Sequence, residues 1–249
     1  MLVSGLLAIP SLASGASGGS SLSPSGGGGV QGQGPGVQPG NVSVSATGGG
    51  LTLTTNASTL LRNQLSFSGT AGRRAAGRTV LIERLGHQTN WQWAPTVTTT
   101  VAADGSFSAV WQTNHIGRFS IRALISQSTA STASQATADT ASATAPTVTI
   151  TVYRQSLATQ YGPGFYGERT ACGQRLRRST IGVANRTLKC GTKVAILYRG
   201  RTMVVPVIDR GPYANGADWD LTMATGHALG IDGTAQIGAV SLPAPPAAG

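Results

Sequence analysis

Short runs of alternating apolar and polar residues constrain this fold more than any other feature of the sequence. Each run has a period of two, and Gly, Asn, Asp or Pro separates it from the next. The runs cover residues 42–46, 51–55, 65–69, 79–84, 107–111, 119–123 and 147–153. Alternation places the apolar side chains on one face of a strand, and evenly punctuated strands are typical of an antiparallel sandwich. We therefore predict an immunoglobulin-like β-sandwich over residues 41–153.

Three tryptophans fall within this predicted sandwich. We expect Trp91, Trp93 and Trp111 to fill the space between its two sheets, because they are the largest apolar side chains there. In a strand, Trp91 and Trp93 would point to the same face. They could then form a sugar-stacking strip instead.

The residues before the sandwich predict export. An apolar stretch from residue 2 to residue 12 precedes the small residues Ala13 and Ala16, which is typical of a secretory signal over residues 1–16. The first basic residue is Arg62, so the signal lacks a basic start; alternatively, the chain begins inside a longer gene product. Residues 17–40 are Gly-rich and predict a flexible linker. No stretch is apolar for long enough to span a bilayer, and no Cys near residue 16 could carry a lipid. We expect a secreted protein associated with the cell wall.

Residues 126–146 are rich in Ser, Thr and Ala, and they predict an exposed loop before the last sandwich strand. Alternatively, they link two domains, and residues 147–153 open the second one. From residue 157 to residue 241, short strands at 193–198 and 202–208 alternate with Gly-rich corners, as in small closed barrels. A short helix is expected at 223–229, between a Thr cap and a terminating Gly. Residues 242–249 predict a disordered tail.

Charge and cysteine content narrow the partners. The net charge of +10 attracts polyanions such as nucleic acid, an anionic cell wall or a membrane surface, or it simply keeps the protein in solution. Residues 154–241 hold eleven basic and five acidic residues, and of these partners we expect anionic cell-wall polymers. No basic run interleaved with aromatic residues indicates nucleic acid. Cys172 and Cys190 predict one disulfide in an exported chain, with two buried free thiols as the alternative. His and Cys residues at zinc-ligand spacing are lacking, so neither a metal nor a cofactor is predicted.

Four segments carry a resemblance to a known family. They read YGPGFYGERTACGQ (161–174), ANRTLKCGTKV (184–194), VPVIDRGPY (205–213) and DWDLTMATGHALGI (218–231). In order and spacing this stretch resembles the rare lipoprotein A (RlpA)-like double-psi β-barrel family, bacterial proteins that act on peptidoglycan. The resemblance implies a six-stranded barrel with a polysaccharide groove, and lytic transglycosylase cleavage of glycan strands. The expected fold class is thus all-β: a sandwich followed by a six-stranded double-psi β-barrel with one short helix.

The resemblance also suggests site residues. Asp209 lies on the catalytic aspartate of the family's DRGP motif, and Asp220 matches a second aspartate that is also found in expansin barrels. Gln174 stands where many members have Glu, and Asn185 where they have His. Tyr161 and Tyr213 lie where relatives line the groove. The predicted substrate-binding residues are Tyr161, Gln174, Asn185, Arg210 and Tyr213.

One carboxyl group is enough for a lytic transglycosylase. The N-acetyl group of muramic acid can stabilise the oxocarbenium ion, and its 6-hydroxyl can then attack, so Asp209 would serve as both acid and base. A general acid needs a raised pKa, which a neighbouring cation opposes. On a continuing strand, Arg210 would point away from Asp209; in a turn, the two could form a structural ion pair.

Three function classes follow. The first is a secreted lytic transglycosylase. The second is a non-catalytic, expansin-like module that binds peptidoglycan or another polysaccharide, since Gln174 and Asn185 replace two titratable groups. The third is a cellulose- or chitin-active barrel in which Asp209 and Asp220 form the usual carboxylate pair.

Overall fold

The computed structural model of the chain describes residues 36–126, 144–213 and 216–245. Within these ranges the fold is all-β, with α2 (Met223–Leu229) as its one α-helix. The predicted signal (1–16), most of the predicted linker, residues 127–143 of the predicted loop and residues 246–249 of the predicted tail lie outside the described residues. No helix in the described part of the chain is long and apolar enough to cross a membrane.

Two groups of strands form the N-terminal sandwich. The first is a four-stranded sheet in the order β2-β3-β5-β8, with β2 (Ser43–Gly48), β3 (Leu51–Asn56), β5 (Gln64–Thr70) and β8 (Ser106–Gln112). The second group has the strand order β10-β9-β6-β7, and β4 pairs with the other side of β10. Its strands are β4 (Ser58–Leu60), β6 (Thr79–Leu85), β7 (Ala94–Thr100), β9 (Gly117–Ile125) and β10 (Thr147–Tyr161). Both groups contribute to a single apolar core.

This core confirms the period-two prediction. In β5 buried and exposed residues alternate, and Phe67 packs in the same core as Ile82 and Phe119 of the other sheet. An antiparallel sandwich is therefore present, while its immunoglobulin-like connectivity stays a prediction.

The prediction for the tryptophans is right for Trp111 and wrong for the other two. Trp111 is 6% exposed and meets Phe119 edge to face at 6.1 Å. Trp91 and Trp93 lie in the loop between η2 (His87–Thr89) and β7, and both are only half-buried. Left-handed backbone angles at Asn90 and Trp91 turn the chain there, so neither a core position nor a strand-based stacking strip is formed.

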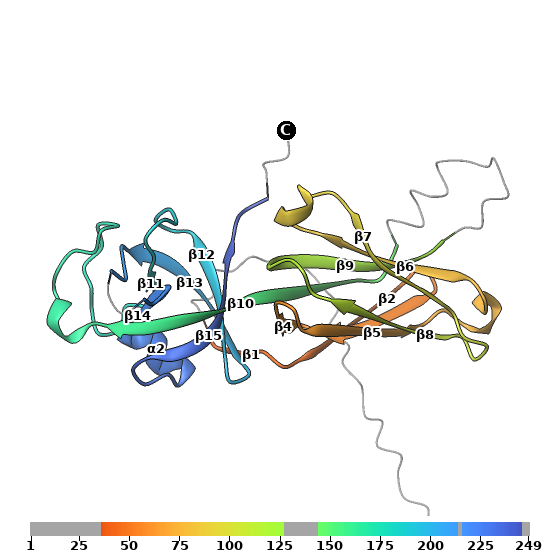
Figure 1. The fold of residues 1–249 in the computed structure, drawn as a ribbon, viewed down its shortest axis with the longest axis horizontal. Coiled ribbons are helices and arrows are strands. Elements are labelled where there is room, and N and C mark those ends of the chain that lie inside the picture. The colour runs from red at the N-terminus through yellow and green to blue at the C-terminus, as the bar shows by residue number, and fades with distance from the viewer. Residues whose placement is uncertain (1–35, 127–143, 214–215, 246–249) are drawn as a thin grey trace, which may run out of the picture. The chain divides into compact units, whose positions relative to one another are not determined.

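Strand β10 belongs to both the sandwich and the barrel. Its residues 147–152 pair with β9, its residues 154–158 pair with β15 (Ala235–Leu242), and its residues 158–161 run parallel to β14 (Trp219–Thr222). Figure 1 shows it as one uninterrupted arrow. The strand that closes the sandwich is thus also the first strand of the barrel, so both readings of residues 147–153 hold in part.

Six strands close the C-terminal barrel. Their order is β10-β15-β12-β13-β11-β14, and β14 pairs back to β10; the remaining bounds are β11 (Val183–Ala184), β12 (Lys193–Tyr198) and β13 (Arg201–Asp209). A second apolar core, which includes Val205, Leu221 and Ile237, fills the barrel. Helix α2 begins and ends as predicted: Thr222 Oγ1 accepts from the Thr225 amide at 3.2 Å, and Gly230 is left-handed.

The end of the predicted linker is attached to this barrel. Strand β1 (Gln38–Pro39) pairs antiparallel with β13, and the Gly40 amide donates to the Gly200 carbonyl at 2.6 Å. A Cβ at Gly40 would stand 2.7 Å from Leu197 Cδ1 and 2.8 Å from Thr202 Cγ2, so a larger residue would require these side chains to shift. Residues 38–40, which were predicted to belong to a flexible linker, are therefore paired with the barrel.

Candidate functional site

The two predicted catalytic aspartates lie in one row across adjacent barrel strands. Ala184 of β11 is the register partner of Asp209 on β13 and of Asp220 on β14, and Asp220 is in turn the partner of Thr159 on β10. Two strand spacings place the Asp209 and Asp220 Cα atoms about 10 Å apart. The residue between them is an alanine, so only a methyl group separates the two carboxyl positions.

A β-bulge brings Asp209 into this row. Val183 pairs with Val207, whereas the next residue, Ala184, pairs with Asp209, so β11 skips Ile208. The Ile208 carbonyl instead accepts from the Cys172 amide at 3.3 Å. A bulge of this kind re-aims the side chains that follow it. Asp209 consequently leaves the buried alternation of β13 and lies at the surface end of the strand.

The row opens onto a groove of about 550 Å³. It is lined by Thr159, Gln160, Tyr161, Gly162, Pro163, Gly164, Phe165, Ala184, Asp209, Arg210, Gly211, Pro212, Tyr213 and Asp220. Two of its aromatic side chains are open to solvent, Phe165 at 58% and Tyr213 at 78% exposure. Exposed aromatic rings beside carboxyl groups suit a saccharide, since an apolar ring face can pack on them while hydroxyl groups reach the polar atoms.

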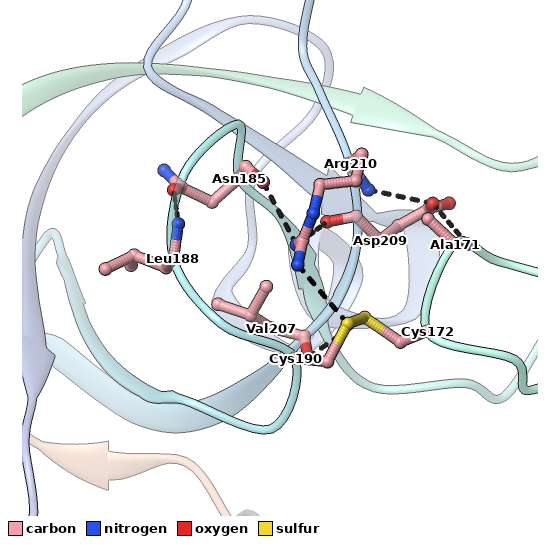
Figure 2. Close-up of a disulfide and its surroundings, with 8 residues drawn as sticks. All are labelled: Ala171, Cys172, Asn185, Leu188, Cys190, Val207, Asp209 and Arg210. Carbon is pink, nitrogen blue, oxygen red and sulfur yellow. Dashed lines mark hydrogen bonds between the residues drawn. A yellow bond between two sulfur atoms is a disulfide. The ribbon is translucent and has the colours of Figure 1, made fainter.

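Arg210 does not neutralise Asp209. Its guanidinium turns toward the disulfide: Nη1 donates to the carbonyls of Asp209 (3.3 Å) and Asn185 (3.4 Å), and Nη2 lies 3.4 Å from Cys190 Sγ (Figure 2). The Asp209 carboxylate accepts from two backbone amides, those of Ala171 and Arg210, both at 2.8 Å from Oδ1. Oδ2 accepts no hydrogen bond in the part of the chain that the structure describes. One oxygen is therefore held in place and the other is free for a ligand.

Asp220 has the electrostatic environment of a proton donor. Burial raises the pKa of its carboxyl group above the ordinary range, and the nearby negative charge of Asp209 raises it further. The Thr159 hydroxyl, which donates to Oδ1 at 2.8 Å, opposes this shift by stabilising the ionised form. A carboxyl group that keeps its proton to higher pH can donate a hydrogen bond to a ligand in the groove.

Tyr161 lines the same groove and is close enough to both carboxyl groups to interact with them electrostatically. Burial raises the pKa of its phenol, and the negative charges of Asp209 and Asp220 add to the effect. Asp209 also raises this pKa as a potential hydrogen-bond acceptor, but the buried hydroxyl has no partner with ordinary hydrogen-bond geometry among the described residues. The ring is fixed edge to face against Phe165 at 6.3 Å. Tyr161 therefore presents a neutral hydroxyl that lacks an acceptor.

Gln174 and Asn185 do not line the groove. The Gln174 side chain is exposed in a turn, and only its carbonyl is engaged, by the Thr170 amide at 2.8 Å. Asn185 Oδ1 accepts from the amides of Thr187 (3.1 Å) and Leu188 (2.9 Å), which is a turn-forming role. The Asn185 amide also donates to the Asp209 carbonyl at 3.2 Å. Asn185 thus supports the DRGP segment from outside the groove, and the role of both residues in substrate binding stays a prediction.

The predicted disulfide between Cys172 and Cys190 is present, with Cα atoms 5.7 Å apart (Figure 2). It joins the loop that follows β11 to the segment that donates the Ala171 amide to Asp209. In the described ranges, no cluster of three or more His, Cys, Asp or Glu side chains could hold a metal ion.

Sequence reasoning missed Phe165, Thr159 and Ala184. Phe165 is the last residue of η3 (Pro163–Phe165) and lies in the segment YGPGF (161–165). Gly and Pro favour surface turns, so the exposure of this ring could have been predicted from its neighbours. Thr159 and Ala184 carry no such signal, because only cross-strand register places them beside the aspartates.

Comparison with known proteins agrees with this geometry. Residues 155–241 match a family model described as lytic transglycolase. A Synechocystis protein named "Probable endolytic peptidoglycan transglycosylase RlpA" is 40% identical over 96 residues, which are 38% of this chain and 30% of that protein. The "Endolytic peptidoglycan transglycosylase RlpA" of Campylobacter jejuni is 34% identical over 85 residues, 32% of this chain and 31% of the relative.

The match is thus confined to one domain, and the chain spans about a third of the length of these curated relatives. Among solved structures, the Streptomyces papain inhibitor is 25% identical, with a TM-score of 0.30, over 36% of this chain and 93% of its own. Six closed strands, four motifs in order and the family match agree with one another. Residues 155–241 of this chain form an RlpA-like double-psi β-barrel.

Proposed function

We propose that the barrel binds peptidoglycan glycan strands in this groove and cleaves them as a lytic transglycosylase, with Asp209 as general acid and base. One observation carries the proposal: Asp209 and Asp220 share one open groove, and the Arg210 guanidinium turns away from the Asp209 carboxylate. A carboxylate clamped by arginine would be a poor acid. Its absence here favours the enzyme over the structural ion pair.

The reaction needs no water. Protonated Asp209 gives its proton to the glycosidic oxygen, the bond from that oxygen to the muramic C1 breaks, and the acetamido group stabilises the cation. The 6-hydroxyl of the same sugar then bonds to C1, and its proton returns to Asp209. Atoms and charges balance, and the product is an anhydro sugar. Asp220, whose pKa is raised by burial, would donate a hydrogen bond to a sugar oxygen while it holds its proton.

We further propose that the protein is exported and associates with the wall. The basic barrel would contact anionic wall polymers, and the sandwich would act as a spacer or docking module. The net charge of +10 and the names of the relatives support these partners.

The test is digestion of purified sacculi. The wild-type protein should release anhydro-muramyl fragments that mass spectrometry detects, and Asp209→Asn should release none while still pelleting with sacculi. Asp232→Asn is the matched control, because Asp232 is exposed and does not line the groove. If the wild type also releases nothing but pellets, the non-catalytic module replaces the enzyme. Binding to cellulose but not to sacculi would instead select the cellulose-active barrel.

A further inference from the structure

A pair of arginines faces the same side of a small hairpin beside the groove. The hairpin, residues 167–176, is held by backbone hydrogen bonds from Gly167 to Leu176 (2.9 Å), from Leu176 to Glu168 (2.9 Å) and from Thr170 to Gln174 (2.8 Å). Between these bonds, Arg169 and Arg175 are partners in an antiparallel bridge. These bonds lie on either side of the pair and do not join the two arginines to each other. Arg169 and Arg175 therefore form a non-hydrogen-bonded antiparallel pair, in which the Cα atoms are about 4.5 Å apart and the side chains are close together.

Two like charges directly opposite each other destabilise a hairpin. Neither arginine has a carboxylate partner: the salt bridge between Arg122 and Glu83 is the only one in the described ranges. Glu168 is the only acidic residue of the hairpin. As the neighbour of Arg169 on an extended segment, it points to the opposite face. The hairpin therefore keeps an uncompensated double positive charge.

Both guanidinium groups are nevertheless held in place. Arg169 Nη1 donates to the Gly173 carbonyl at 2.9 Å, and Arg175 Nη1 donates to the Gly167 carbonyl at 2.7 Å. A guanidinium carries five N–H donors in a fixed planar fork, so most donors of each group stay available. Side chains that are already ordered lose less conformational entropy when a ligand binds.

The hairpin is also rigid at both ends. Leu176 is buried at 2% exposure, Cys172 at the tip is bonded to Cys190, and the Ala171 amide donates to Asp209 Oδ1 (Figure 2). The tip thus touches the candidate catalytic carboxylate directly. A ligand on the arginines would lie next to the groove and not at a remote part of the surface.

We propose that Arg169 and Arg175 form an oxyanion-binding site, separate from the saccharide groove, for the phosphate or carboxylate groups of an anionic wall polymer. Oxyanion groups of one polymer would accept charge-assisted hydrogen bonds from each guanidinium and offset the repulsion between the two positive charges. The site would hold the barrel beside such a polymer while the groove contacts glycan. Only the cellular source of the polymer rests on the proposed function; the oxyanion chemistry does not.

The test compares two double variants of the full chain. Arg169→Gln/Arg175→Gln removes the paired arginines, and Arg73→Gln/Arg74→Gln removes two exposed arginines of η1 (Arg73–Ala75), so both variants lose the same charge. The probes are inorganic polyphosphate and polygalacturonate, which carry phosphate and carboxylate groups respectively. Affinity is measured by fluorescence anisotropy over a series of salt concentrations.

The hairpin variant should bind at least about tenfold more weakly than the wild type. The slope of log K against log salt should fall in magnitude by about 1 to 2, because each lost phosphate contact removes about 0.7 to 0.9. The η1 variant should lose much less. Whether the loss occurs with polyphosphate, with polygalacturonate or with both identifies the anion. Equal losses in the two variants, or no loss in the hairpin variant, would overturn the proposal.

Folding and catalysis are controlled separately. Without polyanion, the hairpin variant should melt at the same temperature as the wild type or higher, since like-charge repulsion is removed. If it melts lower, the single variants Arg169→Gln and Arg175→Gln each repeat the comparison. Asp209→Asn should bind polyanions as the wild type does, because its Oδ1 can still accept from Ala171. Failure of the glycan-cleavage proposal is thus distinguishable from failure of this one.

Discussion

Replacing Tyr161 by Phe should stabilise the free protein while it weakens glycan binding. The substitution removes a single hydroxyl, which is buried and has no acceptor among the described residues. Leaving a buried polar group unpaired costs about 1 to 3 kcal/mol. The ring contact with Phe165 is retained, and the side chain as a whole is only half-buried. We therefore expect the lower end of that range, a rise of about 1 kcal/mol in the free energy of unfolding.

This gain should not depend on pH in the ordinary range. Burial and the two neighbouring carboxylates raise the pKa of the Tyr161 phenol above its usual value of 10. The phenol is then neutral in the folded and the unfolded protein below pH 10, so its replacement changes no proton count. Urea denaturation at pH 6 and pH 8 should give the same difference between variant and wild type.

Glycan binding should change in the opposite direction. With its raised pKa, Tyr161 keeps its proton and can donate it in a hydrogen bond to a sugar oxygen in the groove that it lines with Asp209 and Asp220. Losing one such hydrogen bond costs about 0.5 to 1.5 kcal/mol, which is up to about tenfold in affinity. Co-sedimentation with sacculi over a range of sacculus concentrations measures this loss.

Tyr213→Phe is the matched control, because its ring lies in the same groove at 78% exposure and its hydroxyl meets water. Its stability should stay within about 0.5 kcal/mol of wild type. The reasoning is refuted if Tyr161→Phe destabilises the protein by 1 kcal/mol or more, since the hydroxyl must then have a partner in the free protein.

Two further predictions concern charge and covalent structure. The folded protein binds the proton of Asp220 more tightly than the unfolded chain does, because the pKa of this carboxyl group is raised above 3.8. This contribution to the free energy of unfolding is fully present below about pH 4, and it is lost as the pH rises through the raised pKa. In urea denaturation, Asp220→Asn should therefore become more stable relative to wild type as the pH is raised from 4 to 7. If the difference in the free energy of unfolding between variant and wild type is the same at pH 4 and pH 7, this prediction is contradicted. Cys172→Ser/Cys190→Ser opens an 18-residue loop and should cost about 3 kcal/mol relative to the oxidised wild type, measured by the same method. A loss below about 1 kcal/mol would show that the loop is ordered without the bond.

Much of the architecture could be predicted from local sequence patterns. The sandwich strands follow from alternation, as in β5, and the helix boundaries follow from Thr222 and Gly230. The disulfide follows from two cysteines in a chain predicted to be exported. Where the expectation for Trp91 and Trp93 was wrong, the cause was also local: left-handed backbone angles at Asn90 and Trp91 turn the chain there.

The candidate site could be predicted only in part. The sequence placed Asp209 at the end of a strand, and the resemblance added Asp220 and Tyr161. Neither could say where the Arg210 guanidinium points, because this depends on acceptors contributed by Asn185 and Cys190. The same limit applies to Gln174 and Asn185, which were expected beside substrate and lie outside the groove lining.

Short strands, one capped helix and one disulfide could be predicted from local patterns, because each depends on residues close together in the chain or on composition. That Asp209, Ala184 and Asp220 stand in one row, and that Arg169 faces Arg175, is visible only in the folded protein. Such neighbours are set by cross-strand register and by the bulge at Ile208. Register is decided by the packing of all six barrel strands together, and no window of the sequence contains it.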